Sequence, residues 1–163
     1  MKKALKNTFL ALAFLSFLAC EKDDICTQDD PTTAGVVIEF FDINNPNTAK
    51  TPTGLIAQAN GSQLGISAQG NKLTLPLLVN NTHTTWQLIL NADDTDPNND
   101  IVDQIDFDYV VNHQFVSKAC GYKAIFSLNE TSPVMNTTNW IQNLNLLNTN
   151  ITSQNETHIK IYF

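Results

Sequence analysis

The sequence has no arginine, and its nine lysines are outnumbered by sixteen acidic residues, which gives a formal net charge of −7 at pH 7. Three of the lysines fall within residues 1–6. Proteins that bind nucleic acid, or that adhere to anionic lipid by charge, depend on basic patches. The composition therefore argues against nucleic acid as a partner and against electrostatic adhesion to an anionic membrane.

The sequence also lacks the short motifs of the common enzyme classes. It has no G-x-S-x-G, no H-E-x-x-H and no glycine-rich phosphate loop. No C-x-x-C or H-x-x-x-H spacing points to a metal site. We therefore predict no catalytic residue, and we expect His113, Trp86 and Trp140 to have structural roles.

A long apolar run occurs once, at residues 9–19, directly after the basic segment 1–6. Its length of about 11 residues is well short of the roughly 20 that a membrane-spanning helix needs. This pattern predicts a cleavable signal peptide over residues 1–19. The sequence Leu18-Ala19-Cys20 resembles the bacterial lipobox, in which a small residue precedes a cysteine that receives diacylglycerol. We expect Cys20 to be lipidated and to anchor the protein at a membrane surface.

A charged segment, Glu21-Lys22-Asp23-Asp24, follows the anchor cysteine. It has no apolar surface to bury, so residues 20–34 are predicted to form a solvated tether. Lys22, Asp23 and Asp24 also resemble the export signal of Bacteroidota lipoproteins, which implies display on the outer face of the outer membrane. The alternative is a spacer on a periplasm-facing lipoprotein. In both cases the protein is expected at the outer membrane, held there by lipid.

Two cysteines, Cys26 and Cys120, are left after lipidation. An even pair in an exported chain favours a disulfide, because the compartment is oxidising. Closing a loop of this length would stabilise the fold by about 4 kcal/mol in the chain-entropy model. Two free thiols, or a metal site that also uses His83, His113 or His158, are the alternatives.

From residue 35 onward, apolar residues recur with period two and are interrupted by Asn, Asp, Gly and Pro, which predicts strands and turns. The clearest half-buried strand covers residues 101–111. Its apolar face holds Ile101, Ile105, Phe107, Tyr109 and Val111. Seven to nine short strands without βαβ alternation predict a single all-β domain over residues 35–163, an antiparallel β-sandwich of immunoglobulin-like type.

The segment 139–147 fits two structures. Trp140, Ile141, Leu144 and Leu147 have the spacing of one helical face, whereas Leu144 and Leu146 alternate as in a strand. The sequence leaves both structures open: a short helix near residues 139–147, or a strand.

The segment 91–100 is the one candidate for a cofactor. Its oxygen-bearing side chains alternate in the way that calcium loops use: Asp94, Asp96, Asn98 and Asp100. An EF-hand starting at residue 94 would need glycine at position 99 and an acid at position 105, where the chain has Asn99 and Ile105. The alternative is a polar connection between strands, built from Asx turns.

Five segments of the chain resemble a family of small flavobacterial lipoproteins described only as a domain of unknown function. They are CEKDDIC at 20–26, VIEFFD at 37–42, VSKACGYK at 116–123, NWIQ at 139–142 and HIKIYF at 158–163. The resemblance implies an envelope location and the pairing of Cys26 with Cys120, but no activity.

The expected function is that of a non-catalytic envelope module. It would bind another envelope protein or an extracellular ligand through loops on a rigid sandwich. A glycan-acting hydrolase or accessory enzyme at the cell surface is the alternative, with its two carboxylates on separate strands.

Overall fold

The computed structural model describes residues 25–27, 32–59, 62 and 65–163. The predicted signal peptide lies outside the described residues, as do Cys20, Lys22, Asp23 and Asp24. Every regular element within the described ranges is a strand, apart from one 3-10 turn, η3 (Pro97–Asn99). None of the described residues belongs to a helix that is long and apolar enough to cross a membrane.

Contacts divide the chain into two compact units. The smaller unit contains residues 1–31 and 115–122, and the larger contains residues 32–114 and 123–163. The buried core described below belongs to the larger unit.

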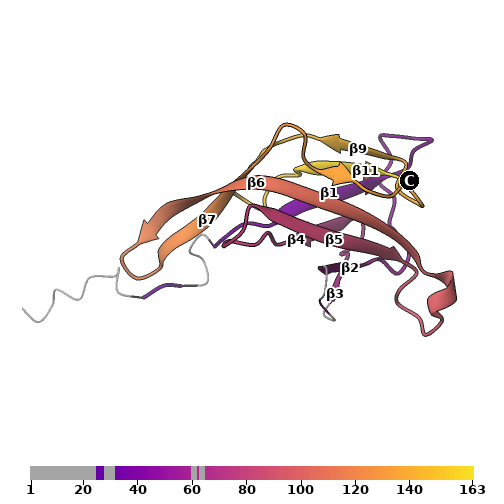
Figure 1. Cartoon of the computed structure of the whole chain (residues 1–163), viewed down its shortest axis with the longest axis horizontal. Helices are drawn as coiled ribbons and strands as arrows, with labels where there is room; N and C mark the ends of the chain where they lie inside the picture. The colour runs from indigo at the N-terminus through magenta and orange to yellow at the C-terminus, as the bar shows by residue number, and fades with distance from the viewer. Residues whose placement is uncertain (1–24, 28–31, 60–61, 63–64) are drawn as a thin grey trace, which may run out of the picture. The chain divides into compact units, whose positions relative to one another are not determined.

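The first sheet joins strands from both ends of the chain (Figure 1). Its order is β4 (Lys72–Leu75), β1 (Val36–Phe41), β11 (Ile159–Tyr162) and β9 (Asn143–Leu146). The outer pairs are antiparallel, but β1 and β11 are parallel, with Ile38 opposite Ile159. The predicted antiparallel arrangement is therefore interrupted by one parallel pair.

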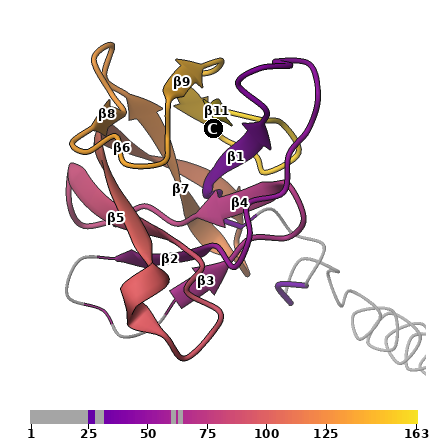
Figure 2. The same ribbon diagram turned by 90° about the vertical axis from the view of Figure 1, so that its right-hand side faces the viewer.

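The second sheet contains a meander of three long strands. Its order is β10 (Asn150–Ile151), β7 (Gly121–Leu128), β6 (Ile101–Ser117), β5 (His83–Leu90), β2 (Ile56–Ala59) and β3 (Gly65–Ser67), and β8 (Val134–Met135) pairs with β6. Figure 2 shows β5 separated from the group of β1, β9 and β11.

Alternate side chains of both sheets meet in one core, which confirms the predicted all-β sandwich. Nine of the twelve largest fully buried side chains come from β1 and β4 on one side and from β5, β6 and β7 on the other: Phe40, Ile38, Leu73, Leu75, Leu88, Ile105, Phe107, Tyr109 and Phe126. Burial of such side chains is the main favourable contribution to the stability of a sandwich.

Of the two alternatives for residues 139–147, the strand is correct and the short helix is wrong. Residues 143–146 form β9 and pair with β11, with Leu144 opposite Ile161. Just before β9, the backbone N–H groups of Asn139, Trp140 and Ile141 donate to the carboxylate of Asp103. Pairing with an available strand thus prevails over the helical spacing of the apolar residues.

His158 is a buried polar residue next to the parallel strand pair. Its Nδ1 accepts the backbone N–H of Val37 at 2.9 Å, so the proton of the neutral ring is on Nε2. Nε2 has no hydrogen-bond partner among the described residues. Burial lowers the pKa of His158 below its usual value, although Glu156 acts in the opposite direction.

Candidate functional site

A hollow of about 460 Å³ lies beside β5, where the β4–β5 connection folds over the start of that strand. We call it the β5 hollow. Its apolar lining residues are Ala59, Pro76, Leu77, Leu78 and Trp86, and its polar lining residues are Asn81, His83, Thr84 and Thr85. A concave apolar surface with a few polar groups at its edge is the usual form of a ligand site.

The connection that covers the β5 hollow is fixed by partly buried hydrogen bonds. Pro76 has no N–H to donate, so β4 ends at Leu75. The indole of Trp86 donates to the carbonyl of Pro76 at 3.2 Å. At Leu78, the N–H donates to the Thr84 hydroxyl at 3.2 Å, and the carbonyl accepts from the Tyr109 hydroxyl at 2.9 Å. These bonds hold Leu78 at the hollow with its side chain 49% exposed.

Tyr109 and Thr84 complete this arrangement from the core side. Their hydroxyl oxygens are 2.6 Å apart. Since the Tyr109 proton is donated to Leu78, the Thr84 hydroxyl donates to Tyr109. Burial raises the pKa of Tyr109, so its phenol stays protonated and continues to donate. The wall of the hollow is therefore preorganised.

A polar network lies on the outer face of β5 and β6. In the register of these two strands, His83 lies opposite Asp108 and Thr85 lies opposite Asp106. His83 Nδ1 is 2.8 Å from Asp108 Oδ1, and His83 Nε2 is 3.0 Å from Thr85 Oγ1. Thr85 in turn donates its proton to Asp106 Oδ1 at 2.7 Å. Both ring nitrogens of His83 thus lie within hydrogen-bond distance of an oxygen atom.

Asp106 is the most strongly bonded carboxylate of this network. Burial alone would raise its pKa, but hydrogen bonds from Thr85 and Asn136 and the charge of His83 together hold the pKa below its ordinary value. Asp106 is therefore ionised at neutral pH, and it keeps the Thr85 proton engaged.

The order Asp108, His83, Thr85 has the connectivity of the acid, base and nucleophile of a catalytic triad. The chemistry nevertheless differs from that of a hydrolase triad. The Thr85 proton is directed to Asp106 rather than to His83, and the side chains of His83 and Asp108 are each 47% exposed. Catalytic triads depend on a base that is free to accept the proton and on an enclosed site. Two members of the network, His83 and Thr85, line the β5 hollow.

Comparison with known proteins shows which family the chain belongs to. The sequence profile of a family of unknown function, DUF6452, matches residues 55–163, which is more than half of the chain. The chain belongs to this family. No curated protein and no solved structure matches it. All residues that line the β5 hollow lie inside the matched DUF6452 region.

In the acidic loop of this DUF6452 chain, residues 91–100, carboxylates accept hydrogen bonds from amide groups of the same loop. Asp94 accepts from the N–H of Asp96 and from the side chain of Asn99, and Asp96 accepts from the N–H of Asn98. These bonds lower the pKa of both carboxyls. Across the described ranges, no group of three or more His, Cys, Asp or Glu is placed to hold a metal.

The loop is thus built from Asx turns, which was the alternative to calcium. Calcium binding by Asp94, Asp96, Asn98 and Asp100 stays a prediction.

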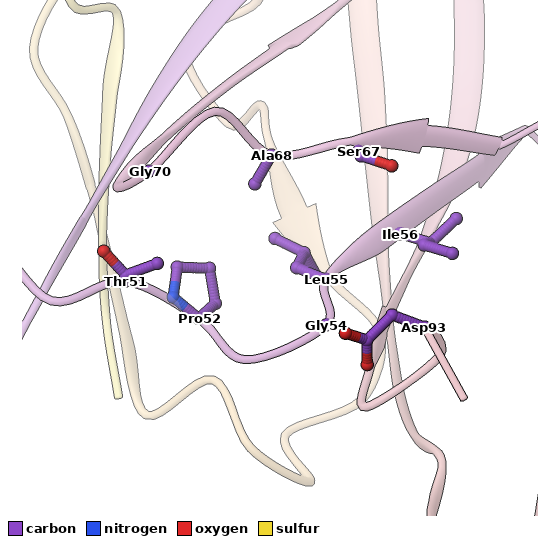
Figure 3. Close-up of a pocket in the computed structure, with 9 residues that line it drawn as sticks. All are labelled: Thr51, Pro52, Gly54, Leu55, Ile56, Ser67, Ala68, Gly70 and Asp93. Carbon is purple, nitrogen blue, oxygen red and sulfur yellow. The ribbon is translucent and has the colours of Figure 1, made fainter. Parts of the chain in front are cut away.

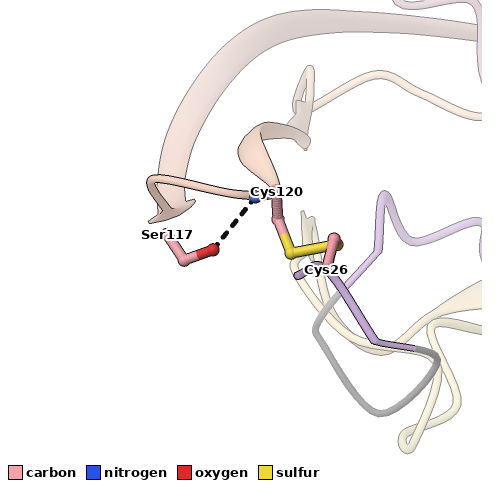
Figure 4. Close-up of a disulfide and its surroundings, with 3 residues drawn as sticks. All are labelled: Cys26, Ser117 and Cys120. Atoms are coloured by element: carbon pink, nitrogen blue, oxygen red, sulfur yellow. Dashed lines mark hydrogen bonds between the residues drawn. A yellow bond between two sulfur atoms is a disulfide. The ribbon is translucent and has the colours of Figure 1, made fainter. Parts of the chain in front are cut away.

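Cys26 and Cys120 form a disulfide, with their Cα atoms 4.9 Å apart (Figure 4). This is the pairing that the family resemblance implies, and it excludes both free thiols and a metal site using these sulfurs. The backbone N–H of Cys120 donates to the Ser117 hydroxyl at 3.0 Å. Both cysteines belong to the smaller unit of the chain.

A second hollow, of about 240 Å³, lies between the segments 51–56 and 67–70 and is shown in Figure 3. Among the described residues of its lining, Asp93 is the one that ionises. Gly54 has φ +57°, and a Cβ at this position would collide with the Asp93 carboxylate. The positive φ favours glycine there, and the Asp93 side chain would have to move to make room for a Cβ. A single carboxylate against a glycine offers few contacts to a ligand.

Sequence reasoning missed the residues that organise these surfaces. Asp103 is fully buried at a core-facing position of β6, whereas the predicted core residue Ile101 is 38% exposed. A charged residue in phase with Ile105 and Phe107 was the available signal. The signal for His83 and Thr85 was weaker, because their partners can be identified only when the pairing of β5 with β6 is known.

Proposed function

We propose that this protein is a lipid-anchored module of the bacterial outer membrane that binds an envelope protein or an extracellular ligand without catalysis. The observation that carries the proposal is the β5 hollow, whose apolar lining, polar edge and fixed wall match what a binding site needs. The ligand would bring an apolar group to Leu78 and Trp86, and hydrogen-bonding groups to His83 and Thr85. A segment of peptide chain has both.

The anchor in this proposal is supported by the sequence of residues 1–20, in which an apolar run too short to span a bilayer ends at a lipobox-like cysteine. Lys22, Asp23 and Asp24 support export to the cell surface. Permanent anchoring needs more than one acyl chain, which diacylglycerol on Cys20 supplies.

A glycan hydrolase has less support at the same surface. A retaining or inverting mechanism needs one protonated carboxyl at neutral pH as the general acid. Asp106 has its pKa below the ordinary value, so it is unsuited to that role. We therefore do not carry this alternative further.

Site-specific photo-crosslinking in intact cells tests the binding role. A benzophenone amino acid is placed at Leu78 in the β5 hollow and, as the matched control, at Leu147, because both leucines are 49% exposed. We expect a discrete adduct from position 78 and none from position 147, and an excess of the unmodified domain should suppress the adduct. Equal labelling from the two positions would contradict the proposal.

A further inference from the structure

The β6–β7 connection exposes two aromatic side chains. We call residues 115–122 the hairpin tip. Phe115, near the end of β6, is 56% exposed, and Tyr122, at the start of β7, is 68% exposed. Their ring centroids are 5.4 Å apart in an edge-to-face arrangement. Two adjacent aromatic rings exposed to solvent form an apolar patch, and such patches are typical of interaction surfaces.

The hairpin tip is covalently joined to the N-terminal segment. Cys120, inside the tip, is bonded to Cys26 (Figure 4). The neighbour of Cys26, Ile25, is 75% exposed and adds a third apolar side chain within the same unit of the chain. The disulfide therefore keeps the exposed aromatic residues close to the N-terminal segment that carries the proposed lipid anchor.

The distance from the anchor is limited by the chain itself. Cys26 follows Cys20 by 26 − 20 = 6 residues. Six residues span at most about 3.6 Å each, or roughly 22 Å in total. Without the disulfide, the N-terminal segment would still be held at β7 by the bond from the Ala124 N–H to the Thr33 hydroxyl, which lies 33 − 20 = 13 residues after Cys20. The disulfide thus restricts the hairpin tip to the immediate neighbourhood of the lipidated residue.

The hairpin tip itself carries no charge that opposes contact with a membrane. After removal of residues 1–19, six lysines and sixteen acids are left, and the net charge is 6 − 16 = −10. The hairpin tip contains one lysine, Lys118, and no acid. Anionic lipid headgroups repel an acidic surface but not this segment.

We propose that the hairpin tip inserts Phe115 and Tyr122 into the interface of the lipid bilayer that carries the anchor. Aromatic side chains prefer this depth, and the tyrosine hydroxyl stays hydrated among the headgroups. The contact gives the anchored chain a second attachment to the membrane, which a lipid on a solvated tether does not provide. This inference rests on the proposed lipidation of Cys20.

The test uses the complete lipidated protein in vesicles of phosphatidylethanolamine with a minor fraction of phosphatidylglycerol, with bromine on the acyl chains as a fluorescence quencher. Phe115→Trp is the reporter and Leu147→Trp is the matched control, since both positions are about half exposed. The native Trp86 and Trp140 are buried and common to both variants. We expect brominated lipid to quench the Phe115→Trp signal about twofold or more above the control, because indole rings partition to the interface.

Each outcome bears on a separate claim. Mass spectrometry and flotation of the wild type first establish whether Cys20 carries lipid, and an unlipidated protein would refute the proposed function before the tip is examined. If the protein is lipidated and floats, but the two tryptophans are quenched equally, membrane insertion of the tip is refuted. A crosslink from position 115 to a protein, with no quenching, would assign the tip to a protein partner instead.

The disulfide provides a second measurement. Adding Cys26→Ser to the Phe115→Trp variant should reduce quenching toward the control value while flotation is unchanged. Undiminished quenching in a folded Cys26→Ser variant would overturn the role given to the disulfide.

Discussion

We predict that replacing the small side chain of Asp103 strongly destabilises the sandwich. Its carboxylate is fully buried and accepts three backbone N–H groups, from Asn139 at 2.7 Å, Trp140 at 2.8 Å and Ile141 at 2.7 Å. These bonds join β6 to the segment that leads into β9, so they connect one sheet to the other. Asp103→Ala removes the acceptor and leaves three N–H groups without it.

The size of the effect follows from the charge of the acceptor. A hydrogen bond to an ionised group contributes about 1.5–3 kcal/mol, and an unsatisfied buried donor costs about 1–3 kcal/mol. Because such terms are not additive, we expect Asp103→Ala to lower the free energy of unfolding by about 3–5 kcal/mol. Asp103→Asn should cost somewhat less, because it keeps one oxygen but turns an NH₂ group toward a donor. The exposed Asp94→Ala is the control, at about 1 kcal/mol or less.

Urea denaturation followed by tryptophan fluorescence measures the difference. Burial alone would raise the pKa of Asp103, but the amides of Asn139, Ile141 and Trp140 together hold the pKa below its usual value. The stabilisation by this group is therefore present above about pH 4, the pKa of an unfolded Asp, and is lost as the pH falls through the folded value. Asp103→Ala should remove that part of the acid sensitivity. A variant within about 1 kcal/mol of the wild type would refute the structural role.

Four further predictions concern other residues. His158 must stay neutral when folded, so the wild type should lose up to about 1.4 kcal/mol per pH unit below the unfolded pKa of about 6.5, and His158→Gln should flatten that slope; an equally steep slope in the variant would argue against it. Cys26→Ser should cost about 2–5 kcal/mol and leave Cys120 alkylatable in denaturant without reductant, whereas an alkylatable Cys120 in the wild type would rule out the bond in solution. Cys20→Ala should abolish incorporation of labelled fatty acid and release the protein from the membrane fraction, and persistent labelling would contradict lipidation there. Replacing Lys22-Asp23-Asp24 with alanines should preserve lipidation but remove surface exposure, and unchanged protease access on whole cells would count against an export signal.

Local patterns in the sequence were sufficient to predict the sandwich. Alternation identified β6 through Ile105, Phe107 and Tyr109, and it identified β11 at the C-terminus through Ile159 and Ile161, all of which are buried. These predictions succeed because one face of each strand is in the core, so burial and side-chain period coincide.

Long-range pairing was beyond the reach of the same patterns. The parallel contact of β1 with β11 joins strands more than 100 residues apart, and no local signal encodes it. The helical spacing of Trp140 and Leu144 was misleading because Asp103, some 40 residues earlier, takes the N–H groups that begin that segment. The β5 hollow was missed for the same reason, since it depends on how Tyr109 reaches Leu78.

The most direct test of the anchored module is the mass of its mature N-terminus. Protein purified from the membrane fraction is digested without reductant, and its N-terminal peptide is identified by mass spectrometry. The account predicts a first residue at Cys20 carrying diacylglycerol, and Cys26 disulfide-bonded to Cys120. An N-terminus at another residue, with Cys20 unmodified or removed, would contradict the anchor and with it the proposed membrane contact of the hairpin tip.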